Sequence, residues 1–423
     1  MSAQHSPIQA VLDNLLMFNR SHSILESVFA ANPKYELVLF DRLPANQREL
    51  LKDLLKDPDF YGVLRPLENS GLGVKSVSRD TALLFLTLQK PGPLPEYVRA
   101  TLGDGCNQEI TRLVLDGVLA LQRDGKYLSG SEAASLIYAG DAESSATSSA
   151  RGILARLSLD ALRYGQSMDL TDPMALSSRL YGYNRVPLSP YWSRTLHDAD
   201  AVANYLGIRE GRVRESLDRE WSRVTNLISN DGWLVWQSRR VGSRSSFGDG
   251  PTIACKLYIS PRPDQLPAVF PALLSALSRT RVRYFKVGKD APGLLRPDKM
   301  VAYFGSYSEL LEATGELKHE LEGCAAQGVP FTAELAGEGL LSWGVDPPAD
   351  DQVLPWIGRE SWRLWVTNRL AVALIAAGKK DGASLEPWQF ALWRLQFEGI
   401  DTVTWTPAGT EWNHSVGTEN QRP

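Results

Sequence analysis

The chain has 423 residues, a formal net charge of −4 and 43% hydrophobic residues. This length predicts two or three domains, and the composition is ordinary for a globular protein with a buried core. No apolar run reaches the roughly 18 residues that a membrane span requires, and the first residues lack the basic and apolar regions of a secretory signal. We therefore expect a cytoplasmic protein without a membrane partner.

The three cysteines, Cys106, Cys255 and Cys324, lie far apart in the chain. No pair has the spacing of a zinc site, and so few cysteines in a chain of cytosolic character do not predict disulfides. The five histidines have no metal-site spacing, and the sequence contains no phosphate-binding loop, dinucleotide fingerprint or G-x-S-x-G motif. We expect neither a metal nor a cofactor.

Residues 1–139 form the first expected domain. Residues 1 to about 75 are predicted to be helical, with an amphipathic stretch at 46–57. Two helices follow, at 81–89, where Asp80 is a candidate cap, and at 91–103, which Pro opens and Gly closes. A third helix at 109–117 precedes two short strands that Asp124-Gly125 joins in a hairpin turn. Three helices followed by a hairpin are typical of a winged helix.

A winged helix has more than one use. Such units bind DNA in regulators, and in peptide-modifying enzymes a similar unit binds the leader of a precursor peptide along its wing strand. The segment that would enter DNA carries Glu109, Arg112 and Asp116 instead of a basic stripe, so we do not expect a nucleic-acid partner. Packing against a neighbouring domain is the alternative to leader binding.

The second expected region covers residues 151–250 and follows a small, polar linker at 140–150. We expect it to be mainly helical, with one or two helices at 199–228. The aromatic segment at 179–192 either lines a peptide groove or forms a core corner. Residues 232–240 alternate as in a strand, and a Gly/Ser loop at 241–251 carries Arg244.

Residues 251–400 form the third expected domain. Residues 253–260 predict a strand with Lys256 and Tyr258 on one face, because residues two apart in a strand project the same way. Segments 264–277 and 306–323 predict amphipathic helices, 281–290 and 301–304 predict strands, and 293–300 predicts a turn. These elements predict an α+β sandwich with a small sheet and helices on one face. A helix closed by Gly378 is expected at 360–378, and a disordered tail at 402–423.

Basic residues concentrate in the third domain. From Arg279 to Lys299 the chain has seven basic and two acidic residues, a local charge of +5 (7 − 2). Such a cluster suits an anionic ligand such as phosphate, and a solvated surface is the alternative. We favour function for Lys256 and Lys286. Lys286 lies between Phe285 and Val287, where partial burial would lower its pKa toward that of a general base.

Several short motifs occur in order between about residues 180 and 380: KLYISPRPDQLPAVFPALL, YFKVGKD, LLRPDKMVAYF, QGVPFTAEL, GLLSWGVDPP and ESWRLWVTNRLAVAL. By these motifs the chain resembles the HopA-type type III effector family, which has relatives in class V lanthipeptide and thioamitide biosynthesis. The resemblance implies a lyase that eliminates phosphate from phosphoserine or phosphothreonine in a ribosomal precursor peptide, leaving dehydroamino acids. It further implies a partner kinase, a cyclase and no cofactor.

A more distant resemblance, to phosphothreonine lyase effectors and to the lyase domain of class III lanthipeptide synthetases, implies roles for single residues. Lys256 and Lys286 match two lysines of that pattern, and Tyr258 stands where the pattern has a histidine. The resemblance implies that Lys286 is the base, that Lys256 polarises the amide carbonyl and that Tyr258 protonates the leaving phosphate. The residues expected to hold the phosphate are Arg296 and Lys299, helped by Arg283, Arg244 or Arg363.

The absent histidine leaves a second hypothesis open. A tyrosine is an intrinsically weaker acid than an imidazolium. A non-catalytic scaffold that binds a phosphopeptide or precursor within a modification complex therefore remains the alternative to a lyase.

Overall fold

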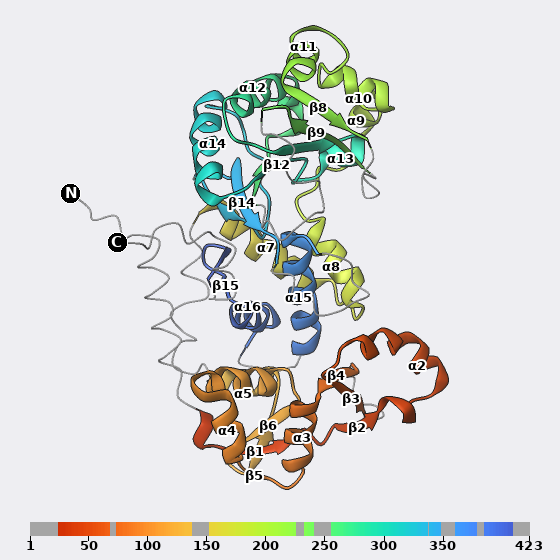
Figure 1. Cartoon of the computed structure of the whole chain (residues 1–423), viewed down its shortest axis with the longest axis vertical. Coiled ribbons are helices and arrows are strands. Elements are labelled where there is room, and N and C mark those ends of the chain that lie inside the picture. The colour runs from red at the N-terminus through yellow and green to blue at the C-terminus, as the bar shows by residue number, and fades with distance from the viewer. Residues whose placement is uncertain are drawn as a thin grey trace, which may run out of the picture. The chain divides into compact units, whose positions relative to one another are not determined.

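The computed structural model describes residues 24–67, 73–137, 152–225, 232–240, 255–336, 338–347, 360–378 and 385–408. The chain divides into two compact units (Figure 1). Unit 1 comprises Met1–Ser148, Gln352–Arg359 and Val372–Phe397, and unit 2 comprises Ser149–Asp351, Glu360–Ala371 and Glu398–Pro423. Both contain helices and strands, which confirms the α+β class. The expected linker at 140–150 and the loop with Arg244 lie outside the described residues.

Unit 1 contains two antiparallel sheets, ordered β5–β1–β6–β7 and β2–β3–β4. Their strands are β1 Val28–Ala31, β2 Tyr35–Leu39, β3 Phe60–Pro66, β4 Lys75–Ser78, β5 Gly92–Pro93, β6 Leu119–Arg123 and β7 Lys126–Leu128. The helical prediction for residues 1–75 was therefore wrong over most of the described part, where α2 (Ala45–Leu51) is the α-helix. β3 pairs with β2 on one side and β4 on the other, and this pairing outweighs local helix preference.

The helices and hairpin expected at 81–130 are present as α3 (Arg79–Thr87), α4 (Glu96–Leu102), α5 (Cys106–Leu115) and β6–β7. Ser78, rather than Asp80, caps α3, and its hydroxyl accepts a hydrogen bond from the Thr81 N–H. Asp124 and Gly125 have φ angles of 49° and 78°. Two consecutive positive φ angles are what a tight two-residue hairpin turn requires.

Unit 1 also includes part of the domain expected at 251–400. The boundary falls within α15 (Trp362–Ala377), and α16 (Pro387–Phe397) belongs wholly to unit 1. α16 packs on α5 and on α6 (Ser131–Ile137), and Arg394 forms an ion pair with Asp116 at 2.6 Å. These two residues are 278 positions apart, so no local sequence pattern could predict their contact.

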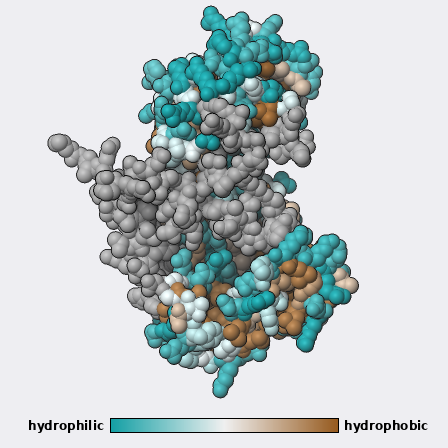
Figure 2. Space-filling view, viewed as in Figure 1, coloured by the Kyte–Doolittle hydropathy of each residue, from teal (hydrophilic) through white to brown (hydrophobic). Residues whose placement is uncertain are grey.

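Apolar side chains gather on the surface of unit 1, over the face that Figure 2 shows, whereas the same view of unit 2 is mainly hydrophilic. The exposed apolar residues of this unit include Leu50, Leu55, Leu67, Val74 and Leu83, with exposed fractions from 47% to 79%. Among the described helices, none is long and apolar enough to cross a membrane.

Unit 2 is built on a seven-stranded antiparallel sheet in the order β13–β14–β10–β12–β11–β9–β8. The strands are β8 Trp221–Val224, β9 Trp233–Ser238, β10 Cys255–Ile259, β11 Tyr284–Gly288, β12 Met300–Phe304, β13 Ala333–Glu334 and β14 Leu341–Val345. The strands predicted at 232–240, 253–260, 281–290 and 301–304 are therefore confirmed. The helix predicted to reach 228 ends at Glu220, because Trp221–Val224 pair with β9.

The middle of the chain is mainly helical, as expected. It forms α7 (Ile153–Ser167), α8 (Pro173–Tyr181), α9 (Pro190–Thr195), α10 (Ala199–Tyr205) and α11 (Gly211–Glu220). Residues 402–408 are not the start of a disordered tail. They complete a hairpin of β15 (Ile400–Asp401) and β16 (Thr406–Pro407). Burial of Trp405 stabilises this hairpin, since its ring is 2% exposed and its centroid lies 5.2 Å from that of the Phe331 ring. Residues 409–423 lie outside the described residues.

Two long helices cover the face of the seven-stranded sheet that lies opposite the lysines. α14 (Tyr307–Glu320) packs on β10 and β12, and α12 (Leu266–Ser278) packs between α14 and α11. Leu257, Phe285 and Ala302 project from the strands into this layer and are at most 1% exposed. Because side chains alternate along a strand, Lys256 and Lys286 project to the opposite face. That face carries the candidate site.

Candidate active site

Three neighbouring strands bring the expected catalytic residues to one face of the sheet. Lys256 lies directly opposite Tyr303, and both Tyr258 and Lys286 lie opposite Val301, in the pairing of β10 and β11 with β12. Directly opposed residues of antiparallel strands project to the same face. Lys256, Tyr258 and Lys286 are thus brought together as the sequence predicted, with Tyr303 among them.

Lys286 is half-buried between aromatic rings. Its Nζ lies 4.1 Å from the centroid of the Trp233 ring and 5.6 Å from that of Tyr303. No described residue offers this Nζ an acceptor within hydrogen-bond or ion-pair distance. The pKa of Lys286 is lowered to about 8, mainly by burial; Asp298 opposes this decrease and Arg296 contributes to it. An amine with this pKa is partly neutral near physiological pH, which is what a general base requires.

Lys256 is held by an acid that the sequence analysis missed. Its Nζ forms an ion pair with the Asp346 carboxylate, and that carboxylate also accepts a hydrogen bond of 3.0 Å from the backbone N–H of Trp362, where α15 begins. Gly344 lies directly opposite Lys256 on β14. A Cβ at Gly344 would lie 2.5 Å from the Trp362 ring. The glycine therefore leaves the space in which Trp362 positions Asp346, and Asp346 in turn positions Lys256.

Replacing Gly344 with Ala is expected to lower the free energy of unfolding by about 1–3 kcal/mol, because the buried Trp362 ring must move. Urea unfolding measures this change. Gly315→Ala is the matched control, because Gly315 lies in α14 and a Cβ there meets no atom within 4 Å. Equal stabilities of the two variants would show that the Trp362 ring does not require a glycine.

Tyr258 is a buried phenol. It is 3% exposed and packs with Val301 and Val329, against Trp233 and Tyr303. Burial, reinforced by the negative charge of Asp346, raises the pKa of Tyr258 well above 10. Its hydroxyl therefore stays protonated and is a weak acid.

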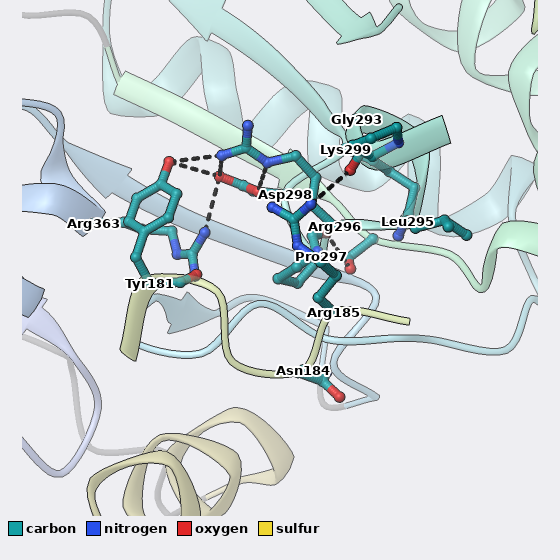
Figure 3. Close-up of polar contacts among 12 residues, drawn as sticks. Tyr181, Asn184, Arg185, Gly293, Leu295, Arg296, Pro297, Asp298, Lys299 and Arg363 are labelled. Carbon is teal, nitrogen blue, oxygen red and sulfur yellow. Dashed lines mark hydrogen bonds and ion pairs between the residues drawn. The ribbon is translucent and has the colours of Figure 1, made fainter. Parts of the chain in front are cut away.

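Asp298 is the centre of a buried polar network (Figure 3). Its Oδ1 accepts from Arg296 Nε at 2.5 Å, and its Oδ2 accepts from Arg296 Nη2 at 2.9 Å and from the Tyr181 hydroxyl at 3.0 Å. Arg363 Nη1 lies 2.9 Å from the same Oδ2. Burial would raise the pKa of Asp298, but Arg363 and Arg296 outweigh it and hold this pKa well below its usual range. The two arginines and Asp298 together carry a charge of +1 (2 − 1).

Local structure positions Arg296. The turn predicted at 293–300 overlaps a short helix, α13 (Ala291–Leu295), which Asp290 caps by accepting from the Gly293 N–H at 2.7 Å. α13 packs directly on β11, and Gly288 allows this close approach: a Cβ at Gly288 would lie 2.3 Å from the backbone of Gly293. Arg296 follows α13, and its guanidinium lies 4.8 Å from the centroid of the Trp233 ring. Tyr181 and Asp298 were not predicted as site residues. Tyr181 lies 117 positions from Asp298, so no local pattern indicates their contact, although Asp298 also pairs with the nearby Arg296.

Lys299 does not face the site. Its side chain is 0% exposed, and its Nζ donates to the Pro261 carbonyl at 2.9 Å and to Gln327 Oε1 at 2.6 Å. Gln327 donates onward to the carbonyls of Asn184 and Leu295. Burial lowers the pKa of Lys299 to about 7. The expected phosphate contact is therefore corrected: the Lys299 ammonium is committed to two acceptors inside the protein, in a network that Gln327 extends to Asn184 and Leu295.

The other three residues expected to bind phosphate differ in where they lie. Arg283 directly precedes β11, and its guanidinium lies against the backbone of Gly305. Arg296 lies near the other end of β11. The structure does not bring Arg283 to the cluster. Arg363 joins the cluster as a buried partner of Asp298, with 1% of its side chain exposed. Arg244 lies outside the described residues.

Unit 2 has a surface cavity of about 430 Å³ away from these residues, lined in part by His197, Asp198 and Lys289. It contains none of the side chains expected to act on a phosphate. Within the described ranges, no three His, Cys, Asp or Glu residues are grouped so that they could hold a metal ion.

No protein-family model matches this sequence, and no curated protein matches it either. Among solved structures, the chain is similar to an effector protein from Pseudomonas syringae pv. tomato strain DC3000, with a TM-score of 0.38, 12% identity, and coverage of 60% of this chain and 97% of that one. The effector protein from Pseudomonas syringae pv. syringae strain 61 gives a TM-score of 0.36 and 11% identity, covering 60% and 96%. The type III effector and phosphothreonine lyase OspF from Shigella flexneri gives 0.25 and 13%, covering 49% and 96%. At TM-scores below 0.5, these likenesses establish neither the fold nor the activity of this chain.

Proposed function

We propose that the site on β10, β11 and β12 binds a phosphorylated peptide and eliminates phosphate from its phosphoserine or phosphothreonine. The observation that carries this proposal is Lys286, a half-buried amine whose pKa is lowered to about 8 and which no described acceptor engages. A base of this kind, next to Arg296 and Lys256, suits removal of a weakly acidic proton beside an anionic leaving group.

The proposed elimination breaks the Cα–H and Cβ–O bonds and forms a Cα=Cβ double bond, without oxidation or reduction. Neutral Lys286 takes the Cα proton, and the electron pair passes through an enolate that charged Lys256 stabilises at the amide oxygen. Phosphate leaves with the Cβ–O electron pair and receives a proton from the Tyr258 hydroxyl. The Lys286 ammonium then returns a proton to the Tyr258 phenolate.

We further propose that the peptide is a ribosomal precursor, that a partner kinase phosphorylates it and that a cyclase consumes its dehydroamino acids in the cytoplasm. Unit 1 would bind the leader as a winged helix. The order α3, α4, α5 and hairpin supports this role, as does β7, which is the last strand in its sheet among the described residues. An outer strand edge of this kind accepts an added peptide strand.

A second candidate function is a scaffold that binds the phosphopeptide without changing it. Tyr258 favours this candidate, because its raised pKa makes it a weak proton donor to the leaving phosphate.

Incubating the whole chain with a phosphothreonine peptide tests both functions. We expect the peptide mass to fall by one phosphoric acid, while the unphosphorylated peptide is unchanged. Binding of the phosphopeptide without mass loss would support the scaffold, and absence of both would contradict both functions.

The pH dependence of elimination is expected to follow Lys286. Its folded-state pKa is lowered to about 8, so the neutral, reactive form decreases roughly tenfold for each pH unit below that value. We expect kcat/KM to rise with pH and to level off above about 8. A series of rate measurements between about pH 6 and 9 checks this, and a profile without an ascending limb would rule out Lys286 as the base.

A further inference from the structure

Five side chains of the site form one alternating stack of cations and aromatic rings. Lys286 Nζ lies 4.1 Å and the Arg296 guanidinium 4.8 Å from the centroid of the Trp233 ring. Arg296 lies 5.4 Å and Arg363 lies 4.4 Å from the centroid of the Tyr181 ring. Arg296 therefore occupies the middle of the stack, between the proposed base and the buried Arg363.

The two arginines that neutralise Asp298 are held in different ways. Arg363 has 1% of its side chain exposed, and it donates to the backbone carbonyls of Tyr181 at 2.7 Å and Pro330 at 3.3 Å. Arg296 has 18% of its side chain exposed. Its recorded acceptors are all side-chain oxygens, those of Asp298 and the Tyr181 hydroxyl. Arg363 is thus fixed by the main chain, whereas Arg296 can rotate away without breaking a backbone contact.

Asp298 would keep partners if Arg296 rotated. Arg363 Nη1 and the Tyr181 hydroxyl both remain within 3.0 Å of its Oδ2. An Asp298 that retains Arg363 is still a paired charge, so the large penalty of a lone buried carboxylate does not arise. Arg296 is then the arginine that can leave without breaking a main-chain contact, while Asp298 stays paired with Arg363.

We propose that a substrate phosphate takes Arg296 from Asp298, and that this exchange selects doubly charged phosphate monoesters over singly charged esters. The inference rests on the proposed function only in requiring that phosphate enters this site. A phosphate monoester dianion offers Arg296 two charges and three acceptor oxygens, against one charge and two oxygens on Asp298. A singly charged sulfate ester merely matches Asp298 in charge, so it gains little by displacing that carboxylate.

Phenyl phosphate and phenyl sulfate test this exchange, because they have the same shape, differ by one charge at about pH 8, and have no Cα proton to eliminate. Calorimetric titration of the full chain is expected to give a dissociation constant for phenyl phosphate roughly 10- to 100-fold lower than that for phenyl sulfate. Equal affinities for the two probes, or no binding of either, would overturn the proposal.

Arg296→Gln is expected to remove most of this preference, so that phenyl phosphate binds about as weakly as phenyl sulfate. Arg179→Gln, an exposed arginine on α8, is the matched control and should keep the preference. A preference that survives Arg296→Gln in folded protein would overturn the exchange.

Tyr181→Phe provides a test that keeps every charge. It removes the hydroxyl that accepts from Arg296 at 2.9 Å. The cost of releasing Arg296 is then lower, so phenyl phosphate, which takes Arg296, should gain more affinity than phenyl sulfate, and the ratio of the two affinities should rise. An unchanged ratio would show that Arg296 does not leave Asp298.

Elimination is scored separately with the phosphothreonine peptide. Dehydration without the charge preference refutes the exchange alone, and the preference without dehydration refutes the lyase alone.

Discussion

Lys286→Ala is expected to lower the rate of phosphate elimination by roughly 10²- to 10⁴-fold, the usual contribution of a positioned general base. The loss follows from the geometry of the site. Lys286 is the amine on this sheet face that is not committed to a described carboxylate, whereas Lys256 is paired with Asp346. Single-turnover assays with a phosphothreonine peptide, read by mass, measure the effect.

The same variant is expected to remain folded. The Lys286 ammonium has no described hydrogen-bond partner whose loss would leave a buried polar group unsatisfied. Lys318→Ala is the matched control, since Lys318 is exposed on α14, which covers the opposite face of the sheet. If Lys286→Ala eliminates phosphate at the rate of this control, Lys286 is not the base.

Asp298→Ala is expected to produce the largest loss of stability, about 3–5 kcal/mol in the free energy of unfolding. Asp298 is 3% exposed, and its removal leaves the buried Arg363 guanidinium without a counter-charge. Urea unfolding of unit 2 measures the loss. Asp264→Ala is the matched control, because the Asp264 side chain is 54% exposed and its arginine partner is also exposed.

The cause of this loss can be separated from loss of packing. A double variant with Asp298→Ala and Arg363→Met removes Asp298 together with its most buried partner charge, so it should be more stable than Asp298→Ala alone. If the second substitution restores no stability, the unpaired Arg363 charge is not the cause.

The stabilising contribution of Asp298 also has a defined pH dependence. Its folded-state pKa is held below the value of about 3.9 that an unfolded aspartate has, so its contribution is fully present above that value. It is lost as the pH falls below about 3.9 toward the folded-state pKa. Unfolding measured across this range should show a smaller decrease for Asp298→Ala than for the unchanged chain.

The central part of unit 2 was predictable because its patterns are local. β10, β11, β12, α12 and α14 each have the apolar period of their own structure, so their order and their buried faces follow from neighbouring residues. Lys256, Tyr258 and Lys286 could be assigned to strands for the same reason. Their placement on one face required the pairing of β12 with both β10 and β11, which the structure supplies.

The first 75 residues show where local patterns were insufficient. The stretch at 46–57 looks helical, and α2 and a short 3₁₀ turn do form there. β2, β3 and β4 are short, and each is stabilised by its neighbours rather than by its own sequence. A helical prediction extended from 46–57 therefore missed a three-stranded sheet.

The sequence by itself determined the α+β class, the strands of Lys256 and Lys286, and the placement of a lysine between apolar neighbours where burial lowers its pKa. Only the tertiary structure decided which cations face one another. Asp298 lies 117 positions from Tyr181, and Lys256 lies 90 positions from Asp346. Three basic residues differ in the exposed fraction of their side chains. Lys299 and Arg363 are buried and bind groups inside the protein, whereas the Arg296 side chain is partly exposed. Charge and burial of this kind depend on residues from distant segments, so they arise only when the chain has folded.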